Sequence, residues 1–268
     1  MNPDVGLRIP DHADARQRLT VSDGTTWADD FGPNGFEPNA RIAKTWRALT
    51  SAEIESLTAI DRGGAANTIA LVAVSDVHRI ALQQFARADS PSRSALNALA
   101  IDIAAHLPAS HWRFAGAHDY AGLSIATPRG ATTNNEESGR RVGLHLDNFD
   151  RLPFEDRHRA SNRICINIGQ HARALQFAPY SVATMLSLLR QRAFDPQQER
   201  SWPMHGGRRL DLARAFLSTF PDAPVFALLL SPGEAYIAPT ENIIHDGLFN
   251  AAPAVDATFT IRGHIEPC

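Results

Sequence analysis

The spacing of apolar residues changes character near residue 111. Before that point, apolar positions recur mainly at helical intervals. A first helix begins at the capping box of Thr50 and Glu53, a second is capped by Ser75, and a third follows Pro91. We therefore predict a mainly helical segment over residues 1–111 that packs on the core of the protein.

From residue 112 onward, short runs of alternating apolar and polar residues are separated by turns. Strands are predicted at about 112–116, 123–127, 142–149, 163–169, 174–178, 224–230, 234–238 and 258–265, after one earlier strand at 68–74. A helical insertion at about 181–220 interrupts them. Because helices do not alternate regularly with these strands, we expect an antiparallel sandwich or jelly roll over residues 112–268, forming one structural unit with the N-terminal segment.

His145 and Asp147 are the first candidate metal ligands. On an alternating strand they project from one face, while Leu144 and Leu146 point the other way. An imidazole and a carboxylate are two of the three ligands that hold non-haem Fe(II). A second His-x-Asp at residues 12–14 lies in a polar stretch without alternation, so the tripeptide alone does not identify a metal site.

His245 is the best candidate for the third ligand, because an apolar Ile-Ile pair and a following glycine place it at the end of a buried run. His205 and His264 are the rivals. One strand later, Thr258, Thr260 and Arg262 share a face. A guanidinium with a neighbouring hydroxyl is suited to hold a carboxylate.

This ordered set resembles the Fe(II)/2-oxoglutarate-dependent oxygenases, whose pattern is His-x-Asp, a distant histidine, and an arginine on the last core strand. The resemblance covers roughly residues 112–265 and implies a mainly β fold with flanking helices, built on a double-stranded β-helix (a cupin-like jelly roll). It implies that His145, Asp147 and His245 ligate Fe(II). Arg262, helped by Thr260 or Thr258, would bind the distal carboxylate of 2-oxoglutarate, and Arg163 is the alternative for this role.

The activity implied by the resemblance is hydroxylation of an unactivated C–H bond by a dioxygenase that uses O₂, with succinate and CO₂ as co-products. Asp147 favours hydroxylation over halogenation, because the related halogenases carry a small residue there. Alternation places Arg141 on the face of His145, so it is the first candidate for substrate contact, with Asn167 and His264 as further candidates. By analogy, we expect a small anionic metabolite such as an amino acid or amino-acid derivative.

Composition adds limits on partners. The chain has 268 residues, 44% of them hydrophobic, a net charge of −3 and two cysteines. This balance gives no electrostatic reason to expect nucleic acid or a membrane as partner, and the N-terminus lacks a signal-peptide pattern, so we expect a cytoplasmic enzyme. A homodimer stays open. Two other hypotheses remain at this point: a non-oxidative cupin-like metalloenzyme, such as an isomerase or hydrolase, and a catalytically silent binding protein.

Overall fold

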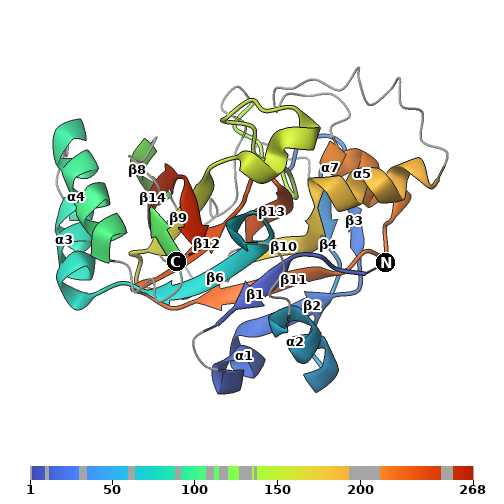
Figure 1. The fold of residues 1–268 in the computed structure, drawn as a ribbon, viewed down its shortest axis with the longest axis horizontal. Coiled ribbons are helices and arrows are strands. Elements are labelled where there is room, and N and C mark those ends of the chain that lie inside the picture. Colours follow the sequence, from blue (N-terminus) through green and yellow to red (C-terminus); the bar gives the residue numbers. More distant parts are fainter. Residues whose placement is uncertain are drawn as a thin grey trace.

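In a computed structural model, the chain folds around two facing β-sheets (Figure 1). The structure describes residues 2–9, 12–29, 35–59, 64–87, 92–106, 112–114, 120–126, 135, 138–192, 212–248 and 256–267. The first sheet has six strands, in the order β1 (Gly6–Arg8), β6 (Thr68–Ala73), β12 (Glu234–Ala238), β9 (Asn162–Asn167), β14 (Asp256–Gly263) and β8 (Tyr120–Ala126). Only the β1–β6 pair among these described strands is parallel.

The second sheet has five strands, and the described neighbours all pair antiparallel. Its order is β13 (Ile243–Leu248), β10 (Arg173–Ser181), β11 (Val225–Leu230), β2 (Leu19–Ser22) and β5 (Trp46–Ala48). Two small ribbons accompany the sheets: β7 (Trp112–Phe114) with β15 (Ile265–Pro267), and β3 (Thr25–Trp27) with β4 (Arg41–Ala43).

A buried apolar core lies between the two sheets. Alternate residues of each strand point into it, for example Leu71 and Tyr236 from the six-stranded sheet and Leu175 and Phe177 from the five-stranded sheet. Helices α1 (His12–Arg18) and α2 (Ser51–Thr58) contribute to the same core. The opposed sheets therefore share one interior, which is where the candidate ligands lie.

Helices cover the outer faces of the sheets (Figure 1). On the six-stranded sheet, α3 (Asp76–Arg87) and α4 (Arg93–His106) pack Leu82 and Ile103 against the strand residues that point outward, such as Ile164 and Ile166. On the five-stranded sheet, α5 (Val182–Arg190) and α7 (Leu212–Thr219) form a third apolar cluster with Tyr180 and neighbouring residues. Two short 3₁₀ turns, η1 (Gly64–Asn67) and η2 (Phe154–Arg159), complete the described elements. No helix in the described part of the chain is long and apolar enough to cross a membrane.

Most of the regular elements expected from the sequence are confirmed. The capping box of Thr50 and Glu53 is formed, Ser181 caps α5, and Ser75 lies just before α3 with its hydroxyl on the His78 amide. The strand predicted at 68–74 is β6, but the N-terminal part is otherwise less helical than predicted, because β1, β2 and β5 also join the two main sheets. Three-residue and four-residue strands carry too little local alternation to be recognised, and their pairing partners lie far away in the chain.

The strand predicted at 142–149 is reduced to isolated bridges, one between Arg141 and Phe36 and one between His145 and His245. Gly143 interrupts it with a φ of 77°, and a Cβ at this position would lie 2.7 Å from the carbonyl oxygen of Arg41. The polar, glycine-containing stretch at 128–140 lies largely outside the described residues. In the second His-x-Asp, His12 begins α1, and the side chains of residues 12–14 are outside the description.

Gly143 supplies a first test of how tightly the chain before the candidate ligands is held. Gly139 also has a positive φ, of 69°, but a Cβ there would meet nothing within 4 Å. We expect Gly143→Ala to lower the free energy of unfolding by about 2 kcal/mol or more, and Gly139→Ala by about 1 kcal/mol, because only the first adds a backbone clash to the left-handed strain. Urea denaturation of both variants measures the difference. Equal losses in the free energy of unfolding would mean that the added Cβ at residue 143 moves away from the Arg41 carbonyl without a measurable energetic cost.

Candidate metal centre

Three buried side chains converge between the sheets: His145, Asp147 and His245. Their relative exposures are 7%, 7% and 2%, and one ligand atom from each lies within 4.8 Å of the others. Oδ1 of Asp147 is 3.7 Å from Nε2 of His145, and Oδ2 is 3.6 Å from Nε2 of His245. All three residues were predicted as ligands from the sequence, and the structure brings them together.

A hydrogen-bonded backbone bridge places the two histidines opposite each other. The amide of His145 donates to the carbonyl of His245 at 3.0 Å, and the amide of His245 donates back at 2.9 Å. Directly opposed residues in an antiparallel pair project on the same face, so both imidazoles enter the interior. Leu144 and Ile244 point the other way, into the cluster under α5 and α7. The alternation inferred from sequence therefore holds locally, although the full strand does not form.

The ring nitrogens and the carboxylate are arranged as metal ligands. Nδ1 of His145 lies 2.7 Å from the Gly143 carbonyl, and Nδ1 of His245 lies 3.3 Å from the Ile243 carbonyl. A carbonyl accepts only from a protonated Nδ1, which leaves a lone pair on each Nε2. Nε2 of both histidines and Oδ2 of Asp147 are buried without a hydrogen-bond partner. Since buried polar atoms are normally satisfied, this convergence of three acceptors fits a bound divalent metal ion.

Protonation states suit a metal at Asp147 and His245, whereas at His145 the ion would compete with a proton. Burial lowers the pKa of His245 to about 3, so its imidazole is neutral at pH 7. Burial acts to raise the pKa of Asp147, but Arg163 and the two imidazoles together hold it well below its usual range. For His145, burial is outweighed by the nearby carboxylates of Asp147 and Asp246, and the pKa is raised. An ionised Asp147 and a neutral His245 are the forms in which these groups ligate metals.

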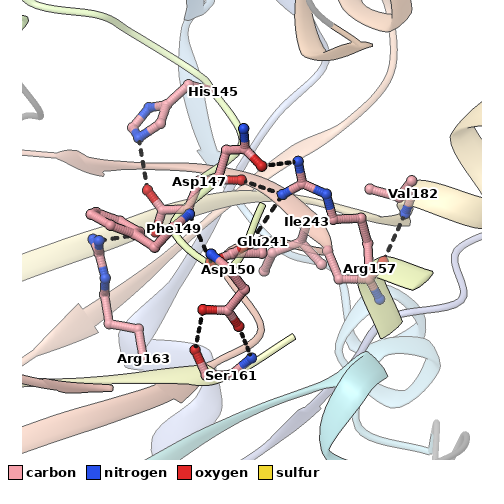
Figure 2. A network of polar contacts seen from close by, with 12 residues as sticks. His145, Asp147, Phe149, Asp150, Arg157, Ser161, Arg163, Val182, Glu241 and Ile243 are labelled. Carbon is pink, nitrogen blue, oxygen red and sulfur yellow. Dashed lines mark hydrogen bonds and ion pairs between the residues drawn. The ribbon is translucent and has the colours of Figure 1, made fainter. Parts of the chain in front are cut away.

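Arg163 forms an ion pair with the Asp147 carboxylate. Its Nη2 lies 2.9 Å from Oδ2 of Asp147, as an ion pair rather than an aligned hydrogen bond (Figure 2). Arg163 comes from β9 on the inner face, as predicted from the alternation with Ile164. It therefore stabilises the charged form of the carboxylate from the side of the six-stranded sheet.

A buried carboxylate, Glu241, holds the chain just after Asp147 (Figure 2). Its Oε1 accepts the amides of Phe149 and Asp150, each at 2.9 Å. Its Oε2 lies 3.1 Å from Nη1 of Arg157, which also donates to the Asp147 carbonyl at 2.7 Å. Burial raises the pKa of Glu241, whereas the Asp150 amide and the arginines act to lower it. With donors on both oxygens, the carboxylate clamps the backbone that carries the metal ligand.

Arg262 belongs to the same cluster. Its Nη2 lies 2.5 Å from Glu241, 2.9 Å from Asp150 and 2.8 Å from the Ser161 hydroxyl, and its guanidinium is 4.2 Å from the Phe149 ring centre. The guanidinium expected to bind a co-substrate is thus held by two carboxylates of the protein itself. Thr258 and Thr260 precede it in β14, opposite Asn167 and Cys165 of β9, respectively.

Of the three residues predicted to contact substrate, Arg141 and Asn167 are engaged elsewhere. Arg141 is half-buried and stacks on Phe36 at 4.2 Å, because the turn at Gly143 separates it from His145. Asn167 is fully buried, donates to the carbonyls of residues 171 and 230, and accepts the Gly169 amide. His264 is exposed after β14. His205 lies outside the described residues.

Sequence reasoning missed Arg173, the first residue of β10. It shares the inner face of the strand with Leu175 and Phe177, and Phe177 is the register partner of His245. The Arg173 side chain is buried and lies 3.6 Å from Sγ of Cys165. The available signal was an arginine at a position that the alternation assigns to the buried, apolar face of the strand.

Comparison with known proteins adds no family to this description. No protein-family model matches the chain, and no curated protein matches it significantly.

The clamp can be tested by removing its charge. Glu241→Gln keeps the shape but leaves two guanidiniums without their shared counter-charge, so we expect the free energy of unfolding to fall by about 3 kcal/mol. Asp222→Asn is the matched control, because Asp222 pairs with Lys44 on the surface and should cost no more than about 0.5 kcal/mol. Chemical denaturation measures both. Equal, small losses would show that Glu241 does not hold the cluster.

Proposed function

We propose that the chain is an Fe(II)/2-oxoglutarate-dependent dioxygenase that hydroxylates a C–H bond of a small, anionic metabolite. The observation that carries the proposal is the buried set of His145, Asp147 and His245, in which Nε2 of both histidines and one carboxylate oxygen converge without hydrogen-bond partners. Two imidazoles and one carboxylate on one side of a metal are the ligand set of non-haem iron oxygenases.

The order of the strands supports a double-stranded β-helix core. From β8 onward the chain passes to the bridge at His145, then to β9, β10 and β11, β12, β13 and β14. Apart from the step from β10 to β11, which are paired in one sheet and joined through α5 and α7, each step crosses from one sheet to the other. This winding is the one that a jelly roll requires, and it puts the ligands of the bridge and of β13 next to each other at one edge of the interior.

The bound iron would supply the oxidising chemistry, consuming O₂ and 2-oxoglutarate and leaving succinate and CO₂. The protein's own residues do the rest. His145, Asp147 and His245 would hold the ion and leave further coordination positions for co-substrate and O₂. Arg163 keeps Asp147 charged, and the Glu241 clamp fixes the backbone from which Asp147 projects.

We assign the distal carboxylate of 2-oxoglutarate to Arg173 rather than to Arg262. Arg262 already donates to Glu241 and Asp150. Arg173 lies on the same inner face as His245, deeper in the sandwich, next to Cys165 and the buried Tyr236. A guanidinium in an apolar interior binds a carboxylate strongly, because water does not compete there.

The rim of the site supports an anionic substrate. Phe149 follows the metal ligand by two residues, is 57% exposed, and covers the guanidiniums of Arg163 and Arg262 at 5.6 and 4.2 Å. An exposed aromatic ring beside buried positive charge offers both an apolar wall and attraction for an anion.

The metal and co-substrate are tested together by anaerobic titration. We expect wild-type protein with Fe(II) to develop a visible charge-transfer band on addition of 2-oxoglutarate, and His245→Ala and Asp147→Ala to lose it, with Asp222→Asn as control. A screen of metabolites scored by succinate release then identifies the substrate. Metal binding without the band, together with turnover in the absence of O₂, would favour a cupin-like metalloenzyme. Absence of iron-dependent 2-oxoglutarate binding would favour a binding protein.

The assignment of the carboxylate is tested by comparing two arginine variants. We expect Arg173→Gln to raise the KM for 2-oxoglutarate on the order of 100-fold, since a charge-assisted pair is lost. Arg262→Gln should instead lower the free energy of unfolding, because it strips Glu241 and Asp150 of a partner. The reverse pattern, a KM effect in Arg262→Gln only, would return the co-substrate to Arg262.

A further inference from the structure

A second group of metal-ligating side chains lies on the opposite, outer side of the six-stranded sheet, between α3 and α4 (Figure 1). It consists of His78 from α3 and of Asp102 and His106 from α4. Asp102 and His106 are four residues apart, so they occupy one face of α4. One ligand atom from each residue lies within 4.8 Å of the others.

The distances suit coordination of a single ion. Nε2 of His78 is 2.9 Å from Oδ2 of Asp102, and Nδ1 of His106 is 3.1 Å from Oδ1 of the same carboxylate. Nδ1 of His106 also lies 2.8 Å from the backbone carbonyl oxygen of Asp102, so a metal ion bound by this nitrogen would displace the proton of that hydrogen bond. Two ligand atoms 2.9 Å apart subtend about 90° at an ion with bonds of about 2.1 Å, which is within the range for divalent transition metals. The carboxylate therefore sits between two imidazoles at ligand spacing.

His78 is held in the orientation of a ligand. Its side chain is 9% exposed, and its Nδ1 lies 2.8 Å from the hydroxyl of Ser75, the residue that precedes α3. In metal sites, a hydrogen bond from the second ring nitrogen fixes the ring and the tautomer in this way. Nε2 of the same ring is hydrogen-bonded to Oδ2 of Asp102 at 2.9 Å, so a metal ion bound here would replace the proton that these two atoms share. His106, at the end of α4, is 64% exposed and completes the set from the solvent side.

We propose that His78, Asp102 and His106 form a second metal site that takes Zn²⁺ or a similar divalent ion such as Co²⁺ and fastens α3 to α4. Two imidazoles and one carboxylate, with water as a further ligand, are a donor set for such ions. The site is chemically independent of the buried triad, because it lies across the sheet on different elements. Its expected effect is metal-dependent stabilisation of the helical layer.

Stoichiometry separates the two sites. Calorimetric titration with Zn²⁺ should give two ions per wild-type chain, one for His106→Ala, and one for the His145→Ala/His245→Ala variant. The triple variant should bind none. His158→Ala is the matched control, because His158 is also an exposed histidine near a helical turn and should retain two ions. Substituting exposed His106 rather than buried His78 keeps the helix packing intact.

Thermal melting gives a second readout that does not require the double variant to fold. A hundredfold excess of Zn²⁺ over its dissociation constant should raise the Tm more in wild type than in His106→Ala, by about 5 °C or more. Equal shifts, or two ions bound by His106→Ala, would overturn the second site while leaving the proposed oxygenase untouched. If wild-type protein binds two ions but shows no 2-oxoglutarate-dependent band, the proposed oxygenase would be overturned and the second site would stand.

Discussion

The buried carboxylate of Glu241 is the interaction on which the site depends. It joins three separate parts of the chain: the backbone after Asp147, Arg157 of the 3₁₀ turn η2, and Arg262 of the last long strand. Removing such charges from water costs several kcal/mol per ion, and this cost is offset only when every donor and acceptor is matched. The network therefore fixes the position of the backbone around Asp147 more than it adds to the net stability of the fold. An Asp147 side chain on a loosely held loop would not meet the two histidines reliably.

The need to pair every buried charge also explains how the arginines near the triad are arranged. Arg163 and Arg262 are directly opposite each other on β9 and β14, an arrangement in which two like charges repel. Each is held by carboxylates on its own side, Asp147 for Arg163, and Asp150 with Glu241 for Arg262. Phe149 covers both guanidiniums. Positive charge is thereby concentrated beside the triad without being left unpaired, which supports the anionic ligands proposed for this site.

The part of the site that could be predicted from sequence depends on how far apart its interacting residues lie in the chain. His145 and Asp147 were found because alternation over four residues is a local signal, and His245 because its chemistry completes theirs. Arg262 was found, but not its partners, since Asp150 and Ser161 lie 112 and 101 residues away in the chain. No local pattern encodes such pairings. Arg173 was overlooked because its run was interpreted as an ordinary strand, although a cation at an inward position was the available clue.

The pairing of β2 with β11 has a consequence for how the protein is made. Ser22 of β2 lies opposite Val225 of β11, so an early strand of the five-stranded sheet pairs with one that is synthesised roughly 200 residues later. At about 5 to 20 residues per second, a ribosome needs on the order of 10 to 40 s to cover that interval. During this time β2, with its apolar residues Leu19 and Val21, has only the three-residue strand β5 as a neighbour in its sheet. The five-stranded sheet therefore cannot be completed until the C-terminal half of the chain has been synthesised. Molecular chaperones that shield the early strands during this interval would increase the yield of folded protein.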